Sequence, residues 1–106
     1  KALGEYSLAR DGELMQEMLL HLGKDDGLAE YGILPVQNAI KAGAAHTVLV
    51  SASLLHEQKE ITNTILDEAK RAGIMFHVLD EKQEPGKQLA GLGGIAALLR
   101  YRMNFN

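Results

Sequence analysis

The sequence predicts an α/β fold in which helices cover a parallel or mixed central sheet on both faces. Three short apolar segments, at 47–50, 74–79 and 95–99, have the composition of buried strands. Amphipathic segments with helical spacing lie before and between them, and glycines mark the boundaries. Alternation of helix and strand is typical of a sheet sandwiched between helical layers.

The composition indicates one ordinary globular domain over residues 1–106. Apolar residues make up 46% of the chain and charged residues 24%. There is no cysteine, which excludes disulfides and thiolate metal sites and fits a reducing compartment. The net charge of −3 argues against a domain whose main task is to wrap nucleic acid. No apolar run approaches the ~20 residues that span a bilayer, so no membrane partner is expected.

Two amphipathic helices are predicted in the first half of the chain. The first covers residues 13–22, with Asp11 as its N-cap and Gly23 as its stop. The second begins at Pro35 and ends at Gly43. Both carry apolar residues that recur with a period near 3.6, so these residues should face the core: Leu14, Met15, Met18, Leu19 and Leu22 in the first, and Val36, Ala39 and Ile40 in the second.

The second half alternates strands and helices. The strand at 47–50 should be central, and Ser51–Ser53 after it should form a capped turn. A helix at 59–72, a buried strand at 74–79 and a short helix at 86–92 follow. The helix at 59–72 should bury one stripe of side chains: Ile61, Ile65, Leu66, Ala69 and Ala72.

The last segment combines a glycine-rich turn, an apolar run and a basic, aromatic end. We expect the turn to be made by Gly91, Gly93 and Gly94, because glycine adopts backbone angles closed to other residues. The apolar run that follows fits a strand buried on both faces, although its length and its Ala and Leu content also permit a short helix. Arg100–Arg102 should then emerge at the rim of the sheet. Two arrangements stay open: an exposed binding surface, or Tyr101 in the core with both arginines solvated.

No residue set in the sequence demands catalysis or a cofactor. The four histidines lack the i, i+4 spacing of a zinc helix and fit structural or surface positions: His21, His46, His56 and His77. Ser51 and Ser53 lack a G-x-S-x-G elbow. The acidic residues Asp80, Glu81 and Glu84 fit a solvated loop. We therefore expect a binding domain without metal or cofactor rather than an enzyme.

Five motifs together resemble the C-terminal domain shared by archaeal and eukaryotic class 1 peptide chain release factors and by the Pelota ribosome-rescue factors. They are Lys24–Gly32 (KDDGLAEYG), Val36–Ala44 (VQNAIKAGA), Val48–Ser51, Glu84–Leu89 (EPGKQL), and Gly93–Ile95 with Leu99–Arg102. Each motif alone is weak, but their order and spacing cover most of the chain.

The resemblance implies an α/β sandwich related to ribosomal proteins that bind kinked RNA. It also implies that the domain binds a translational GTPase similar to elongation factor Tu, and that Ala97, Leu98, Leu99, Arg100 and Tyr101 help to make this contact. The ribosome, reached through the full-length protein, and the recycling ATPase are further implied partners, in the cytoplasm. The Gly-Gly-Gln tripeptide of peptide release is absent from these residues, so the domain should act as an adaptor.

The family resemblance leaves several alternatives open. The KDDG turn and the Leu99–Arg102 ending favour a release factor and translation termination, whereas Glu84–Gly86 and the compact join at Leu55–Glu60 favour Pelota. Many release factors carry an inserted minidomain at this join, so an insertion near Gln58 and Lys59 in the native chain is a further expectation. The start at Lys1 rather than Met fits a C-terminal fragment of a longer protein. An RNA-binding module of the ribosomal-protein type is the alternative from another class.

Overall fold

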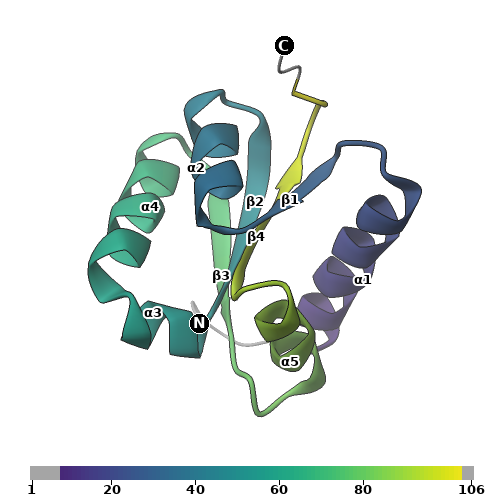
Figure 1. The fold of residues 1–106 in the computed structure, drawn as a ribbon, viewed down its shortest axis with the longest axis vertical. Helices are drawn as coiled ribbons and strands as arrows, with labels where there is room; N and C mark the ends of the chain where they lie inside the picture. The colour runs from purple at the N-terminus through teal and green to yellow at the C-terminus, as the bar shows by residue number, and fades with distance from the viewer. Residues whose placement is uncertain (1–7, 104–106) are drawn as a thin grey trace.

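One mixed sheet lies between two layers of helices (Figure 1). The computed structural model describes residues 8–103. Its elements, in chain order, are α1 (Leu8–Lys24), β1 (Ala29–Tyr31), α2 (Ile33–Lys41), β2 (Ala45–Ser51), α3 (Ala52–Glu57), α4 (Lys59–Arg71), β3 (Met75–Leu79), α5 (Glu84–Gly91) and β4 (Ile95–Leu99). This arrangement confirms the predicted α/β class with helices on both faces of a mixed sheet.

The sheet has the strand order β1-β4-β2-β3. β2 and β3 run parallel, whereas β4 runs antiparallel to both of its neighbours, β1 and β2. All five residues of β4 are buried. The segment is therefore a strand and not the alternative short helix, because pairing on both edges outweighs the modest helix preference of Ala and Leu.

Side chains of β4 alternate between two hydrophobic cores. Ile95, Ala97 and Leu99 join the core beneath α2 and α4. Ala96 and Leu98 join the core beneath α1 and α5. Alternation with a period of two places every residue of a central strand in one core or the other.

The first two helices begin earlier than predicted. α1 starts at Leu8 and ends at Lys24, so Asp11 lies within its first turns rather than at the N-cap, and Gly23 lies inside the helix. Leu19 was expected in the core but is 39% exposed, because it lies on the flank of the stripe formed by its neighbours. α2 starts at Ile33, two residues before Pro35, and buries Val36, Ala39 and Ile40 as predicted.

In the second half of the chain, the structure differs from the prediction at the ends of helices and strands. Ala72 is the exposed C-cap of α4 and not part of the buried stripe. β3 was expected to be buried, yet Met75 is 63% exposed because β3 lies at an edge of the sheet. α5 starts at Glu84 and ends at Gly91, so Gly91 belongs to the helix and not to the turn.

Two short elements were not predicted from the sequence. β1 has three residues, too few to display an alternating pattern. α3 follows the capped turn directly: Ser51 Oγ accepts a hydrogen bond from the Leu54 backbone N–H at 3.1 Å. Gln58 caps both α3 and α4, so the two helices join without a spacer in this sequence. The insertion near Gln58 and Lys59 stays a prediction about the native chain.

Candidate functional site

The residues after β4 emerge at one end of the molecule, beside two turns from elsewhere in the chain (Figure 1). The Arg100 backbone N–H donates to Ala44 O at 2.7 Å, in the turn between α2 and β2. Arg102 lies against the turn between α1 and β1, because a Cβ added to Gly27 would come within 2.6 Å of Arg102 Cγ. We call this surface, made by residues 24–28, 41–44 and 100–102, the Arg-Tyr end.

Tyr101 is a surface residue with an anchored hydroxyl. Its O–H donates to Ala42 O at 2.8 Å, while the side chain stays 48% exposed. The alternative that placed Tyr101 in the core is therefore wrong. β4 ends at Leu99, so Tyr101 has no strand partner that would bury it. The anchored ring offers apolar area with little rotamer entropy left to lose on binding.

Arg100 keeps most of its hydrogen-bonding capacity. Its guanidinium makes one long contact, from Nη2 to Ala45 O at 3.5 Å. No ion pair joins Arg100 to a carboxylate within residues 8–103. Because a guanidinium carries five N–H donors, Arg100 can offer a bidentate contact to an acidic group on a partner.

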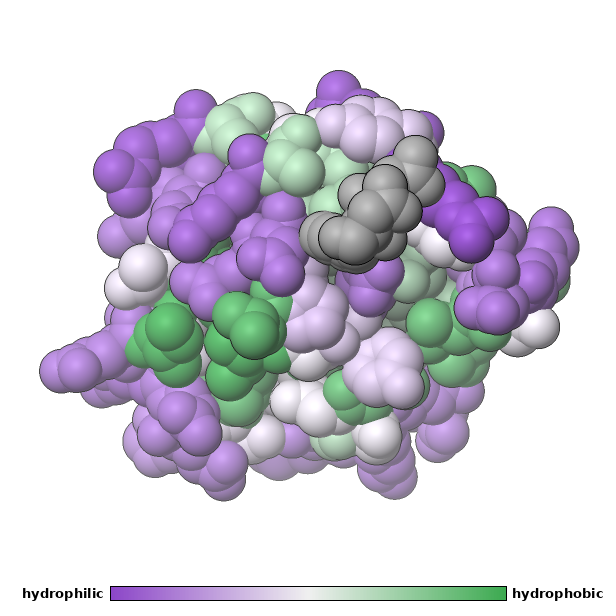
Figure 2. Space-filling model, turned by 45° about the horizontal axis from the view of Figure 1, so that its top comes forward, coloured by the Kyte–Doolittle hydropathy of each residue, from purple (hydrophilic) through white to green (hydrophobic). Residues whose placement is uncertain are grey.

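The Arg-Tyr end is more basic than the chain as a whole. Lys24 and Lys41 end their helices here, beside Arg100 and Arg102, against two acidic residues, Asp25 and Asp26. Figure 2, in which the top of Figure 1 comes forward, shows a mostly hydrophilic surface with separate hydrophobic patches. A positive end on a chain of net charge −3 fits a partner with an acidic surface.

Asp26 fixes the turn between α1 and β1. Its carboxylate contacts the His21 ring nitrogen Nδ1 at 2.8 Å and accepts the Leu28 backbone N–H at 3.0 Å. The hydrogen bond from His21 lowers the pKa of Asp26, with a smaller contribution from the Leu28 N–H. An aspartate two residues before the backbone N–H that it accepts is typical of an Asx turn, so the sequence carried a local signal for this geometry.

The other residues predicted to contact a partner are inaccessible. Ala97, Leu98 and Leu99 are buried in the centre of the sheet, so their side chains do not reach the surface. Of the five predicted residues, only Arg100 and Tyr101 present side chains to solvent. Arg102 was predicted to emerge at the rim of the sheet but not as a contact residue. Lys24 and Lys41 were not predicted, because only the fold brings their segments beside Arg100.

The predicted turn glycines lie at the opposite end of β4. Gly93 and Gly94 form the turn with φ of +100° and +89°. Gly94 O accepts the Ser51 backbone N–H at 2.7 Å, so this turn joins β4 to the end of β2.

The remaining chemistry-bearing residues are dispersed. Within residues 8–103, no three or more His, Cys, Asp or Glu side chains are grouped to hold a metal ion. His77 Nδ1 lies 3.8 Å from Asp11 Oδ1, and Glu81 accepts hydrogen bonds from the backbone N–H and hydroxyl of Ser53. Glu81 is thus engaged by α3 rather than fully solvated. None of the helices described is long and apolar enough to cross a membrane.

The fold defines a class of α/β domains in which one mixed four-stranded sheet lies between layers of helices. A family model described as eRF1 domain 3 matches residues 8–103. The chain therefore belongs to the eRF1 domain 3 family.

Curated relatives include Pelota homologues from methanogenic archaea. The chain is 42% identical over 103 residues to the protein pelota homolog of Methanoregula boonei and 39% identical to that of Methanoculleus marisnigri. Each match covers 97% of this chain and 29% of the relative. The chain thus spans less than a third of the length of these relatives.

Solved structures of Pelota-type and release-factor proteins also match this chain. Dom34 of S. cerevisiae, described as a translation termination-like factor that interacts with Hbs1, matches with TM-score 0.83 and 33% identity, over 90% of this chain and 28% of Dom34. A model of ribosome-bound archaeal Pelota and ABCE1 matches with TM-score 0.79 and 33% identity, over 92% and 28%. The archaeal termination factor aRF1 matches with TM-score 0.73 and 30% identity, over 88% and 26%.

Proposed function

We propose that this chain is the partner-docking domain of a Pelota-type ribosome-rescue factor, and that its Arg-Tyr end binds a translational GTPase. The observation that carries the proposal is the 42% identity to a Pelota homologue over 97% of the chain. Dom34, a structural neighbour, interacts with Hbs1, which supports a partner of the translational GTPase class. Because such factors act on ribosomes, the cytoplasm is the proposed location.

The mechanism assigns separate roles to Arg100 and Tyr101. Arg100 supplies charge-assisted hydrogen bonds to an acidic group on the GTPase. Tyr101 supplies a rigid ring, held by its bond to Ala42 O. The surrounding lysines and Arg102 steer an acidic partner toward this end and make association sensitive to salt. The domain acts as an adaptor and performs no chemistry itself.

Calorimetric titration of the chain with the GTPase from the same source, loaded with a GTP analogue, tests this role. We expect saturable 1:1 binding that Arg100→Ala weakens by about 1–3 kcal/mol, as for an interface hot spot. Lys87→Ala is the matched control, because Lys87 is an exposed cation on α5, away from the Arg-Tyr end. Equal losses in the two variants would refute the assignment of the contact to Arg100.

A release factor is the second candidate. It is favoured by the family model, eRF1 domain 3, and by the match to aRF1. The two candidates differ in what the full-length protein does: a release factor liberates peptide from ribosomes stopped at a stop codon, whereas a rescue factor acts on stalled ribosomes without requiring one. Stop-codon-dependent peptide release by the full-length protein would favour the release factor.

Two further partners stay proposals. The ribosome-bound archaeal structure pairs Pelota with ABCE1, and this supports a recycling ATPase as a second partner of the full-length protein. RNA binding through the basic end is the alternative from another class. Tight binding of a kinked RNA at physiological salt, with a steep loss of affinity as salt rises, would support it.

A further inference from the structure

β3 is an edge strand that lacks the usual protection against pairing. It ends the strand order, and no strand within residues 8–103 pairs with its outer edge. Its five residues, Met75–Leu79, include no proline, lysine or carboxylate. β3 also has no β-bulge, because the one register shift in the described sheet falls between β2 and β4. The other edge strand, β1, is protected by its short length. An uncharged edge of this length is a template for another extended segment.

The side chains along β3 leave part of this edge apolar and open. Met75 is 63% exposed, and Phe76 to Val78 are only half-buried. Lys70 Nζ of α4 lies 5.7 Å from the centroid of the Phe76 ring, so its ammonium covers one face of this ring. A segment that pairs here would gain main-chain hydrogen bonds and cover apolar surface together.

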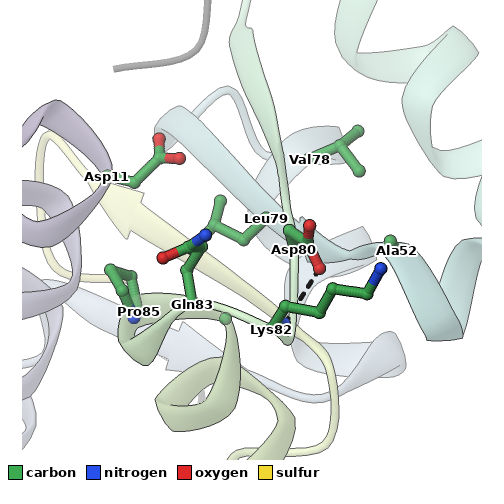
Figure 3. Close-up of a pocket in the computed structure, with 9 residues that line it drawn as sticks. Asp11, Ala52, Val78, Leu79, Asp80, Lys82, Gln83 and Pro85 are labelled. Carbon is green, nitrogen blue, oxygen red and sulfur yellow. Dashed lines mark hydrogen bonds between the residues drawn. The ribbon is translucent and has the colours of Figure 1, made fainter. Parts of the chain in front are cut away.

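A cavity of about 480 Å³ lies across the carboxyl end of β3. Figure 3 shows Asp11 of α1 on one side, Ala52 of α3 on the other, and Leu79 and Asp80 between them, with Pro85 at the start of α5. The volume lies within the range of sites that hold a ligand or a large side chain. The edge of β3 therefore leads directly into a cavity.

The charges in this cavity favour a cation. Asp11 and Asp80 contribute carboxylates, and Lys82 is the cation in the lining. The Asp11 side chain is only 14% exposed, and the His77 ring nitrogen Nδ1 lies 3.8 Å from Asp11 Oδ1, beyond hydrogen-bond distance. Burial raises the pKa of Asp11, so its carboxylate is poorly solvated where it stands. No ion pair joins Lys82 to either aspartate within the described residues.

We infer that the outer edge of β3 and the cavity at its end form a docking surface for an extended segment of a partner protein that carries an arginine or lysine. The segment adds to the sheet as a fifth strand, and its basic side chain enters the cavity and pairs with Asp11 and Asp80. This surface is distinct from the Arg-Tyr end, so one domain can hold two partners at once.

Charge complementarity selects a basic partner over a second copy of this chain. The chain has a net charge of −3, and two copies paired through β3 would bring no further basic side chain to Asp11 and Asp80, because β3 carries no lysine or arginine. An extended basic segment of a partner would pair with the edge of β3 and also place a cation beside Asp11 and Asp80.

Two synthetic peptides test the inference. Both alternate threonine and valine and have blocked ends; one carries a terminal arginine and the other citrulline, its uncharged counterpart, and each is made with this residue at either end. We expect the arginine peptide to shift the backbone amide NMR signals of residues 75–86 in the labelled chain, with an affinity at least threefold above that of the citrulline peptide. Equal affinity of the two peptides, or shifts elsewhere, would overturn the inference.

Variants separate the two parts of the surface. Asp11→Asn should abolish the preference for arginine and leave binding of the citrulline peptide unchanged, whereas Met75→Lys should weaken both peptides by placing a charge on the edge. Asp67→Asn, an exposed aspartate on α4, is the matched control and should change neither. Signals of residues 75–79 that shift with protein concentration alone would indicate self-pairing and contradict the inference. Binding of the GTPase should be unaffected by Asp11→Asn, so this test is independent of the proposed function.

Discussion

At the residue scale, Gly94 joins the turn before β4 to the end of β2, because its carbonyl accepts the Ser51 backbone N–H. Its φ is +89°, a conformation that L side chains rarely adopt. A Cβ at this position would also lie 2.9 Å from Ser51 Oγ and 3.1 Å from Leu54 Cβ. The same Ser51 hydroxyl caps α3, so a side chain at Gly94 would disturb both the turn and the cap.

Gly94→Ala should therefore destabilise the fold more than an alanine at an uncrowded glycine. Gly73 is the matched position, with φ of +74° and open space within 4 Å of where a Cβ would lie. Each alanine costs about 1–2 kcal/mol for the left-handed conformation, and Gly94→Ala adds about 1 kcal/mol from the disturbed cap. Urea unfolding of the two variants measures the difference; equal losses would show that Ser51 and Leu54 move aside freely.

The Asp26 contacts should make stability depend on pH. Because the pKa of Asp26 is lowered in the folded state, its contribution is present above the unfolded value near 3.9 and is lost as the pH falls through the folded value. Asp26→Ala should lower the melting temperature at pH 7, and the difference should shrink toward pH 2. Thermal unfolding across this range provides the check. A difference that stays constant with pH would mean that the charge of Asp26 contributes nothing.

At the scale of the elements, β4 carries much of the stability because it is central and buried on both faces. Leu98 is 1% exposed and packs beneath α1 and α5. Leu98→Ala should cost about 2–5 kcal/mol, the usual range for a buried leucine. Leu34→Ala is the control, because Leu34 is 66% exposed on α2 and should change stability by less than about 0.5 kcal/mol. A small loss for Leu98→Ala in urea unfolding would contradict the central role of β4.

Sequence patterns predicted the elements that bury a long apolar stripe and missed those that do not. The helices around Val36 and Ile65 and the strand through Val48 follow their hydrophobic period closely. β1 and α3 are too short to show a period, and they form because β4 and Ser51 offer them hydrogen-bond partners. The exposure of Met75 depends on the position of β3 in the sheet, which follows from strand order and not from local sequence.

At the scale of the whole molecule, the candidate site is an assembly of three segments that are distant in the sequence. Arg100 and Tyr101 were predicted as contact residues from the family resemblance, and the basic, aromatic end after a buried strand left an exposed surface as one of two open arrangements. Ala97 to Leu99 belong to the same motif but are buried, because β4 continues to Leu99 with a strand on each side. Lys24 and Lys41 could not be identified, since only the turns on either side of β4 bring them to the end where Arg102 lies.

The Arg-Tyr end and the cavity of the second proposed docking surface lie at opposite ends of the sheet. The Arg-Tyr end lies where β4 finishes, and the cavity lies where β3 finishes, at the other end of the sheet (Figure 1). Partners at the two surfaces need not compete, because β2 separates the outer edge of β3 from β4 and the cavity lies at the far end of the sheet.

The proposed binding of a translational GTPase through the Arg-Tyr end can be tested by amide hydrogen exchange of the domain, measured with and without the GTP-loaded partner. We expect slower exchange in the complex at the 41–44 turn and at residues 100–102, with exchange in β3 and at residues 80–86 unchanged. Slower exchange only in β3 and around the cavity would contradict the proposed function of the Arg-Tyr end. So would unchanged exchange at every residue although the partner binds.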